Sequence, residues 1–239
     1  MNETPFLLQL KFYKTPQTTC PYLPNKKEQL IFTHINDLDS DITHDFMAKS
    51  GFRRSHGIIY KPDCENCNEC KPVRISAKEF QFSKKYLRIL NKNSEINSNE
   101  VKLVGTNEQY SLFKKYQNNR HKNGNMSLME LNEYKSMVEE SPVNTILLEY
   151  RNNNGKLLAA SLTDQLFDGY SMVYTFYDPK EKNKSLGNFM ILDHINRARK
   201  KALSYIYLGY YIKDCSKMSY KKNFKPLEIL HNKTWNNFE

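Results

Sequence analysis

The chain has 239 residues, enough for one large domain or two small ones that each bury a core. Its 36 Lys and Arg outnumber its 26 Asp and Glu, giving a formal net charge of +10, and it also carries 16 Tyr and 13 Phe. No apolar run approaches the roughly 20 residues that cross a bilayer, and the N-terminus lacks an apolar signal core. We therefore expect a cytoplasmic protein that does not enter a membrane. Its basic, aromatic surface suits RNA rather than DNA, although a lysine-rich solvated surface has the same composition.

The first part of the chain predicts short strands around one helix. Strands are expected over Leu30 to Ile35 and in the segment that ends at Tyr60. Between them, Asp41 to Lys49 predicts a short helix, and Gly51 suits the left-handed residue that often follows a helix. We assign these elements to an N-terminal domain of residues 1–95.

A cluster of cysteines follows the second of these strands. Cys64, Cys67 and Cys70 have the spacing C-x₂-C-x₂-C, and Cys20 lies earlier in a proline-bounded segment. Thiolates three residues apart in a turn can converge on one soft ion, either zinc or an iron-sulfur cluster, and disulfides are rare in the cytosol. Reduced cysteines without a metal give the same pattern, so both interpretations stay open. Cys215, far off in sequence, is interpreted as a lone thiol.

The polar run Asn91 to Asn99 has no periodicity and predicts a linker to a C-terminal domain of residues 96–239. Beyond it, Thr106 to Arg120 has helical spacing. Ser127, with Glu130 three residues later, matches a capping box and predicts the start of another helix.

Strands dominate the rest of the second domain. Segments 145–150 and 157–162 flank a turn that ends at Gly155, so they predict a hairpin. An alternating apolar run predicts a further strand ending at Tyr177, and a last strand is expected over Leu227 to Leu230. With the helices, these strands predict an α+β sheet domain.

The segment from Gly169 to Pro226 predicts a strand, loop, helix, strand unit. Ser185 is the expected N-cap of a helix that ends in the basic turn Arg197 to Lys201, and Tyr205 to Leu208 is the second strand. In open α/β sheets such units place ligands near strand ends and helix N-termini.

Ten short motifs occur along the chain between Cys20 and Pro226. In order, they are Cys20-Pro-Tyr-Leu-Pro, Phe52-Arg-Arg-Ser, Tyr60-Lys-Pro-Asp-Cys64, Pro72-Val-Arg-Ile, Arg120-His121, Phe176-Tyr-Asp-Pro179, Ser185-Leu-Gly187, Tyr207-Leu-Gly-Tyr-Tyr-Ile212, Lys217-Met-Ser-Tyr-Lys221 and Phe224-Lys-Pro226. Together they resemble the arginyl-tRNA protein transferase family. The length and the three-cysteine cluster are similar to its short bacterial branch, the leucyltransferases.

The resemblance implies a fold, an activity and two partners. The fold is a mixed sheet with flanking helices related to GCN5-type acetyltransferases (GNAT), in two such halves. The activity is transfer of leucine from leucyl-tRNA to proteins that begin with Asp or Glu, which marks them for degradation in the N-degron (N-end rule) pathway. The chain departs from the eukaryotic branch, which has C-G-Y-C where this chain has Cys20-Pro21-Tyr22-Leu23, so a metal role there does not carry over directly.

The chemistry of such a transfer requires little machinery. An aminoacyl-tRNA ester is already activated, so no cofactor or ATP motif is needed, and the sequence has no Gly-rich Walker loop. The attacking α-amine has a reference pKa near 8, so about a tenth of it is neutral at pH 7. Asp178 is the candidate for holding or deprotonating this amine, unless Asp178-Pro179 only ends the strand as a turn. Tyr210 is the second candidate catalytic residue.

A second group of residues is expected to bind the aminoacyl-tRNA end. Helix N-termini attract phosphate, glycine permits close approach, and tyrosine rings stack on bases. An ordinary helix cap and core packing explain part of the same pattern. The group consists of Tyr174, Ser185, Gly187, Asn188, Gly209 and Tyr211.

A third group is expected to recognise the acidic N-terminus of the substrate. Guanidinium forks bind carboxylates through two hydrogen bonds, and lysine supplies a further positive charge. We expect two members to reach the substrate and the others to contact phosphate or solvent. The group consists of Arg53, Arg54, Arg74, Arg120, His121, Lys217 and Lys221, with His121 alternatively a base or a structural histidine.

Two alternatives to leucyl transfer remain at this point. One is arginyl transfer, which only the resemblance to the bacterial branch disfavours. The other is a noncatalytic RNA-binding or metal-knuckle module that uses the same basic, aromatic surface.

Overall fold

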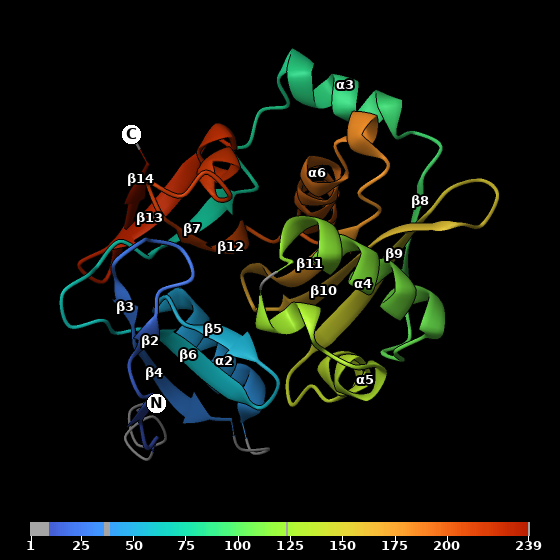
Figure 1. Ribbon diagram of the computed structural model, residues 1–239. Helices are drawn as coiled ribbons and strands as arrows, with labels where there is room; N and C mark the ends of the chain where they lie inside the picture. Colours follow the sequence, from blue (N-terminus) through green and yellow to red (C-terminus); the bar gives the residue numbers. More distant parts are fainter. Residues whose placement is uncertain (1–9, 36–38, 123, 239) are drawn as a thin grey trace.

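An eight-stranded mixed sheet forms the centre of the computed structural model, which describes residues 10–35, 39–122 and 124–238 (Figure 1). Its strand order is β14-β13-β7-β12-β11-β10-β9-β8. The strands are β7 (Lys71–Ser76), β8 (Asn97–Val101), β9 (Thr145–Arg151), β10 (Leu157–Gln165), β11 (Gly169–Tyr177), β12 (Tyr205–Tyr211), β13 (Leu227–His231) and β14 (Thr234–Asn237). The expected α+β architecture with a mixed sheet is confirmed.

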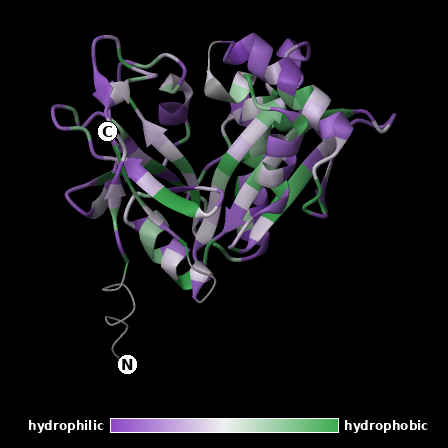
Figure 2. Ribbon diagram, turned by 60° about the horizontal axis from the view of Figure 1, so that its bottom comes forward, coloured by the Kyte–Doolittle hydropathy of each residue, from purple (hydrophilic) through white to green (hydrophobic). Residues whose placement is uncertain are grey.

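Helices cover both faces of this sheet, which is why its middle strands read as nearly continuous apolar runs. Along β9, Leu148 belongs to the core cluster of α6 (Leu186–Lys200), whereas Leu147 belongs to that of α4 (Asn107–Arg120) and α5 (Leu131–Glu139). Neighbouring side chains of a strand point to opposite faces, so these helices lie on opposite sides of the sheet. Figure 2 shows hydrophobic residues along the strands and hydrophilic ones on the outer helices and loops. α3 (Lys84–Lys92) packs beside α6.

The N-terminal part forms a separate four-stranded antiparallel sheet with the order β1-β4-β6-β5. Its strands are β1 (Tyr13–Lys14), β4 (Leu30–His34), β5 (Arg53–Ser55) and β6 (Ile58–Pro62). Met47 of α2 (Ser40–Lys49) packs against Ile59 on one face of this sheet. A two-stranded ribbon, β2 (Thr18–Thr19) with β3 (Lys27–Glu28), carries Cys20. The expected strand and helix before Gly51 are confirmed.

The predicted linker over Asn91 to Asn99 is wrong. Asn97–Val101 form β8, which pairs with β9 at the edge of the large sheet. Asn93 is buried, and its amide donates to the carbonyls of Ile89 and Lys184. Polar residues suit this segment because an edge strand needs few apolar side chains. The domain boundary near residue 95 stays a prediction. β7 precedes that boundary in sequence but lies between β13 and β12 in the large sheet.

The predicted helix start at Ser127 is also wrong. Ser127 ends a 3₁₀ turn (Asn125–Ser127), where its hydroxyl bonds the carbonyl of Gly124 at 2.7 Å. α5 begins four residues later, at Leu131, and the backbone N–H of Glu130 donates to the Glu133 carboxylate at 2.7 Å. The capping pattern was therefore read three residues too early, because Ser127 satisfies a turn rather than a helix end.

The hairpin β9–β10 and the unit β11–α6–β12 are confirmed. Ser185 precedes α6 as predicted, but in the left-handed region (φ 52°) and without a side-chain cap hydrogen bond. The apolar side of α6 is buried against the sheet as expected. No helix among the described residues is long and apolar enough to cross a membrane.

Candidate active site

β11 and β12 run parallel but pair over only three residues each. Hydrogen-bonded partners run from Gly169 with Tyr205 to Ser171 with Tyr207, and the rest of β11 continues to Tyr177 without a partner on β12. On its other side β12 has a register shift against β7 next to Gly209, whose φ is +73°. The two strands therefore part toward their carboxyl ends, where ligands of open α/β sheets bind.

Arg53, on β5 of the small sheet, reaches into the gap between the parting strands. Its Nη2 donates to the carbonyls of Met172 at 2.9 Å and Val173 at 3.0 Å, which β12 leaves unpaired. Its Nη1 is buried and has no hydrogen-bond partner among the described residues. A Cβ built on Gly209 would lie 2.4 Å from this Nη1, so only glycine leaves room for the guanidinium there. A buried donor without a partner suits an anionic ligand.

The end of β11 meets the N-terminus of α6 across a pair of tyrosines. Tyr177 packs against Gly187, where a built Cβ would lie 3.4 Å from its ring, and its ring centroid is 4.9 Å from that of Tyr116 on α4. Tyr220 lies near both this pair and Arg53. Burial raises the pKa of Tyr220 to about 12, and Tyr116, Arg53 and Tyr177 are the next influences on it.

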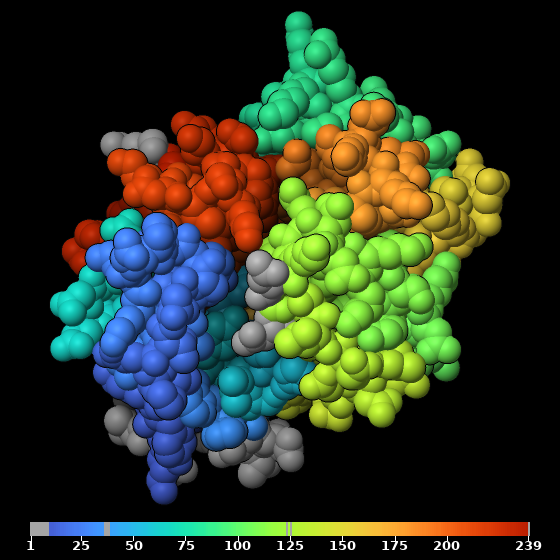
Figure 3. All heavy atoms as spheres, viewed as in Figure 1, coloured from blue at the N-terminus to red at the C-terminus, as the bar shows by residue number. Residues whose placement is uncertain are grey.

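Cations surround the same tyrosines. His121 caps the C-terminus of α4, and its ring lies 5.7 Å from that of Tyr116. Burial lowers the pKa of His121, and the nearby charges of Lys217 and Arg120 lower it further. His121 is therefore neutral at pH 7. The structure thus brings together predicted residues from separate parts of the chain: Arg53, Gly209, Gly187, Arg120, His121 and Lys217. Figure 3 shows that the surface is hollowed between the blue N-terminal segment and the green segment that includes α4.

Other predicted cations are bound within the protein. Arg54 is 4% exposed and forms a two-pronged ion pair with Asp164, at 2.6 and 2.8 Å, while the Nε2 of His44 lies 2.9 Å from the same carboxylate. Although burial opposes it, Arg54 and His44 hold the pKa of Asp164 well below its usual range. Arg54 consequently joins the small sheet to β10 and is not free to bind a substrate.

Arg74 and Lys221 are also engaged. Arg74 pairs with Glu228 at 2.7 Å, donates to Tyr207 at 3.1 Å, and its guanidinium lies 3.5 Å from the Tyr205 ring centroid. Lys221 is buried and donates to the carbonyl of Tyr210. Burial lowers the pKa of Lys221 to about 7, and the neighbouring charge of Arg53 contributes. Both side chains are therefore held by internal partners next to the site.

The two candidate catalytic residues both have internal partners. Asp178 is 3% exposed and pairs with Lys156 at 3.1 Å. Although burial alone would raise it, the backbone N–H of Lys180 and the Lys156 ammonium lower the pKa of Asp178, so it is a weak base. The Tyr210 hydroxyl donates to the carbonyl of Gly51 at 3.1 Å, and burial raises its pKa well above the ordinary value. Both residues have a structural role in this conformation.

The remaining predicted residues of the tRNA end divide between surface and interior. Ser185 is exposed, and Asn188, in the first turn of α6, is half-buried. The Tyr174 hydroxyl bonds the Gln117 amide of α4, and Tyr211 packs edge-on against Phe238 at 5.1 Å. Only Ser185 and Asn188 are therefore open beside Gly187.

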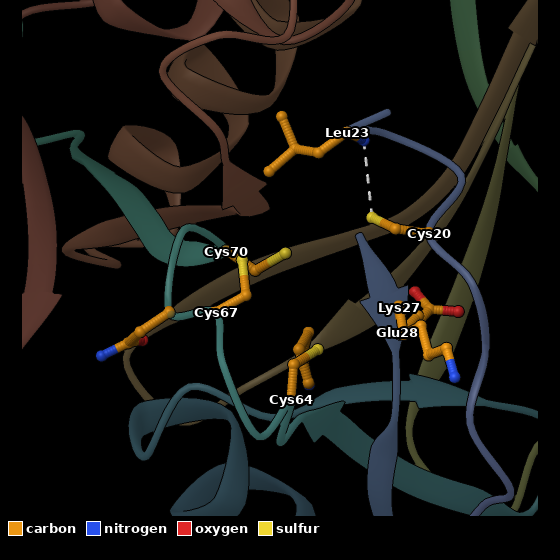
Figure 4. Close-up of a pocket in the computed structure, with 9 residues that line it drawn as sticks. Cys20, Leu23, Lys27, Glu28, Cys64, Cys67 and Cys70 are labelled. Atoms are coloured by element: carbon orange, nitrogen blue, oxygen red, sulfur yellow. Dashed lines mark hydrogen bonds between the residues drawn. The ribbon is translucent and has the colours of Figure 1, made fainter. Parts of the chain in front are cut away.

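The four cysteines line one pocket beside the site (Figure 4). Cys20 faces the other three across the pocket, and its Sγ accepts the backbone N–H of Leu23 at 3.5 Å. Burial, and after it the charges of the other three cysteines, raise the pKa of the Cys70 thiol to about 12. Within the described ranges, no set of three or more His, Cys, Asp or Glu side chains is arranged to hold a metal ion. Four thiols lining one pocket are the donor type that zinc and iron-sulfur clusters take, so the residue types fit such a group although they do not converge on one point in this structure.

Sequence reasoning missed the tyrosines that connect the two ends of the site. Tyr177 precedes Asp178-Pro179, Tyr220 lies inside the motif Lys217 to Lys221, and Tyr116 is one helical turn before Arg120. The last spacing, i to i+4 on one helix face, was a usable signal. Motif reading assigned the charged members of these stretches and passed over the aromatic ones.

A mixed sheet whose parallel strands part beside a helix N-terminus, lined by cations and tyrosines, is an arrangement suited to binding anionic ligands. Comparison with known proteins identifies the family. The chain belongs to the arginine-tRNA-protein transferase family: models of the N-terminal and C-terminal parts match residues 18–88 and 108–231.

Curated relatives match over nearly the whole chain. Proteins named aspartate/glutamate leucyltransferase from Hyphomonas neptunium and from a Bradyrhizobium species are 43% and 44% identical to it, over 95% and 94% of this chain and 91% of each relative. Among solved structures, L-PGS from Bacillus licheniformis gives a TM-score of 0.48 at 14% identity, covering 72% of this chain and 49% of that one. A GCN5-related glucosamine N-acetyltransferase region of a fungal multi-domain protein gives 0.42 at 13% identity, over 85% of this chain and 23% of that one.

Proposed function

We propose that this protein transfers leucine from leucyl-tRNA to the α-amine of proteins that begin with Asp or Glu, and so marks them for degradation. The observation that carries the proposal is the similarity to curated aspartate/glutamate leucyltransferases at 43% and 44% identity over almost the full length of both chains. The cationic, tyrosine-lined region between β11, β12 and α6 supplies a physical setting for the reaction.

Arg53 is the proposed receptor for the side-chain carboxylate of the substrate. Its Nη2 is fixed by two backbone carbonyls, and its Nη1 is the buried donor without a partner in the described residues. A fixed guanidinium loses little conformational freedom on binding, which favours selectivity for a carboxylate over a neutral side chain. Arg120 and Lys217 are proposed to contact the tRNA phosphates instead, because Arg120 lies against Tyr116 and Tyr177 and both charges lie close to His121.

The leucyl ester is proposed to lie beside the N-terminus of α6. Gly187 permits close approach, and the first N–H groups of the helix favour an anion there. In the reaction the neutral α-amine attacks the ester carbonyl, a tetrahedral intermediate forms, and the ribose hydroxyl leaves with a proton that originates from the amine. Alignment supplies most of the rate enhancement, since the ester is already activated and a tenth of the amine is neutral at pH 7.

Asp178 and Tyr210 are not assigned a proton-transfer role in this scheme, because both are tied to internal partners. The tyrosines that face the site, Tyr116, Tyr177 and Tyr220, are proposed to stack on the terminal bases of the tRNA and to order the amine. No step runs through the cysteine pocket. Its thiols stay a candidate site for zinc or an iron-sulfur cluster with a structural role.

The proposal is tested by incubating the protein with radiolabelled leucyl-tRNA and peptides that begin with Asp, Glu or Ala. Leucine is expected on the first two peptides only, and arginyl-tRNA is expected to be a poor donor. Arg53→Gln is expected to lower kcat/KM for the Asp peptide about thirtyfold or more, because it removes a buried charge pair. Arg88→Gln, an exposed arginine on α3, is the matched control. If neither acidic peptide received leucine from leucyl-tRNA, the proposal would be refuted.

A further inference from the structure

An aromatic row crosses the small sheet and ends on Arg53. Cross-strand partners join Tyr13 of β1 to Phe32 of β4, Phe32 to Tyr60 of β6, and Tyr60 to Arg53 of β5. Directly opposed residues of a sheet project from the same face, so these four side chains form one line. The ring centroids of Tyr13 and Phe32 are 5.7 Å apart.

The face that carries the aromatic row is open to solvent at its β1 end, whereas Phe32, Tyr60 and Arg53 are half-buried. The strand neighbours of its members point to the other face. These neighbours, Thr33, Ile59 and Arg54, are 2%, 0% and 4% exposed. Tyr13, by contrast, is 48% exposed, and His34, which lies edge-on to Phe32 at 5.9 Å, is exposed as well. Surface aromatics in a continuous line are uncommon in the absence of a partner. The row therefore starts in solvent and leads into the site.

The distribution of charge bears on whether RNA or a polypeptide binds the aromatic row. Six exposed lysines lie on or just after α4, in the loop between β11 and α6, and in segment 217–222: Lys115, Lys122, Lys180, Lys182, Lys217 and Lys222. The β1 end of the row carries both signs of charge: Lys14 is paired with Asp63 at 2.6 Å, Glu28 lies close to the Tyr22 ring beside Tyr60, and the nearby Lys11, Lys26 and Lys27 are exposed. Nucleic acid affinity comes largely from neutralised phosphates, so these six lysines, rather than the aromatic row, are the expected RNA contacts.

We propose that the aromatic row binds the substrate polypeptide immediately after its acidic N-terminal residue. This inference rests on the proposed function, since it assumes that the acidic residue itself lies at Arg53. Aromatic faces hold an extended chain through apolar and backbone contacts without selecting one sequence, which suits an enzyme whose substrates share only their first residue.

The row sets the length of peptide that it can hold. From β5 to β1 there are three strand spacings of about 4.8 Å, or about 14 Å in all. An extended peptide advances about 3.4 Å per residue, so the row accommodates about four residues after the first. Peptides of five or more residues should therefore bind better than dipeptides, and further lengthening should add nothing.

The test measures KM for an Asp-Ala dipeptide, for a six-residue peptide that begins with Asp, and for leucyl-tRNA, in wild type and in Tyr13→Ser, Phe32→Ser and the double variant. The double variant is expected to raise KM for the six-residue peptide about tenfold, to leave the dipeptide and leucyl-tRNA values unchanged, and to keep the preference for acidic over neutral first residues. Phe167→Ser, an aromatic that is 65% exposed on the turn after β10, is the matched control.

A parallel measurement separates this inference from the proposed function. Fluorescence anisotropy of a labelled six-residue Asp peptide reports binding without any leucine transfer. Binding that the double variant weakens about tenfold supports the row even if the wild type is inactive with leucyl-tRNA. Equal peptide binding by folded wild-type and double-variant proteins overturns it, as does a rise in the KM for leucyl-tRNA alone, which would assign the row to RNA. Thermal melts identify any variant that is not folded.

Discussion

Replacing Gly209 with alanine should displace Arg53 from the gap between β11 and β12. The new Cβ would lie 2.4 Å from Nη1 and 2.8 Å from Cζ of Arg53, well inside van der Waals contact. The guanidinium would have to withdraw, and its two hydrogen bonds to Met172 and Val173 would be lost.

The size of the effect follows from two contributions. A residue other than glycine at φ +73° costs about 1 kcal/mol of stability, or 2 to 4 °C in Tm for a chain of this size. Losing the position of the guanidinium removes charge-assisted hydrogen bonding worth about 2 kcal/mol at the substrate carboxylate, or roughly thirtyfold in kcat/KM for an Asp peptide.

The chain contains a control that isolates the second contribution. Gly155 has φ +77°, but nothing lies within 4 Å of a Cβ built there, so Gly155→Ala introduces strain without a clash. We expect it to melt at a lower temperature and to transfer leucine normally. In an Arg53→Ala background, Gly209→Ala should cost no further activity, since the clashing group is absent. A Gly209→Ala enzyme with kcat/KM within twofold of Gly155→Ala would refute the argument.

Three further predictions follow from the charged groups and the thiols. Asp164→Asn should destabilise the protein by about 3 to 5 kcal/mol in urea unfolding because it leaves buried Arg54 unpaired, whereas Asp63→Asn, in the exposed pair with Lys14, should cost less than about 1 kcal/mol. Lys217→Ala should raise the depressed pKa of His121 in an NMR titration, whereas Lys233→Ala, on the turn before β14, should not. Since folding lowers that pKa, the stability due to neutral His121 should be lost as pH falls through about 6.5, and an unchanged titration in Lys217→Ala would contradict the placement of these two groups. Metal analysis after anaerobic purification should find zinc or iron that Cys67→Ser loses and Cys215→Ser retains, and a metal-free wild type would leave the pocket as reduced thiols.

Local patterns in the sequence predicted the elements but not the pairing of the strands. The hairpin around Gly155 and the unit from β11 to β12 followed from turn residues and from apolar spacing, which are properties of neighbouring positions. The insertion of β7 between β13 and β12 depends on partners about 130 to 150 residues away, which no local pattern encodes. For the same reason β8 was mistaken for a linker.

Whether a predicted site residue is available for a ligand depends on its contacts within the protein. Motifs identified Arg53, Gly187, Gly209 and His121, which the fold gathers from four distant segments. The same motifs offered Arg54 as an equal of Arg53, although adjacent residues of a strand face opposite ways and Arg54 turns inward to Asp164. Which of two neighbouring arginines is free depends on the register of β5, and the sequence alone does not specify that register.

The position of β7 has a mechanical consequence. Because β7 is hydrogen-bonded on both edges, the polypeptide that leads to it from the small sheet is tethered to the strand that carries Gly209. Arg54, clamped by Asp164, adds a second tether close to Arg53. The strand that carries Arg53, the proposed receptor for the acidic residue, is thus anchored at two points, so the position of its guanidinium is fixed by folding, before either substrate binds.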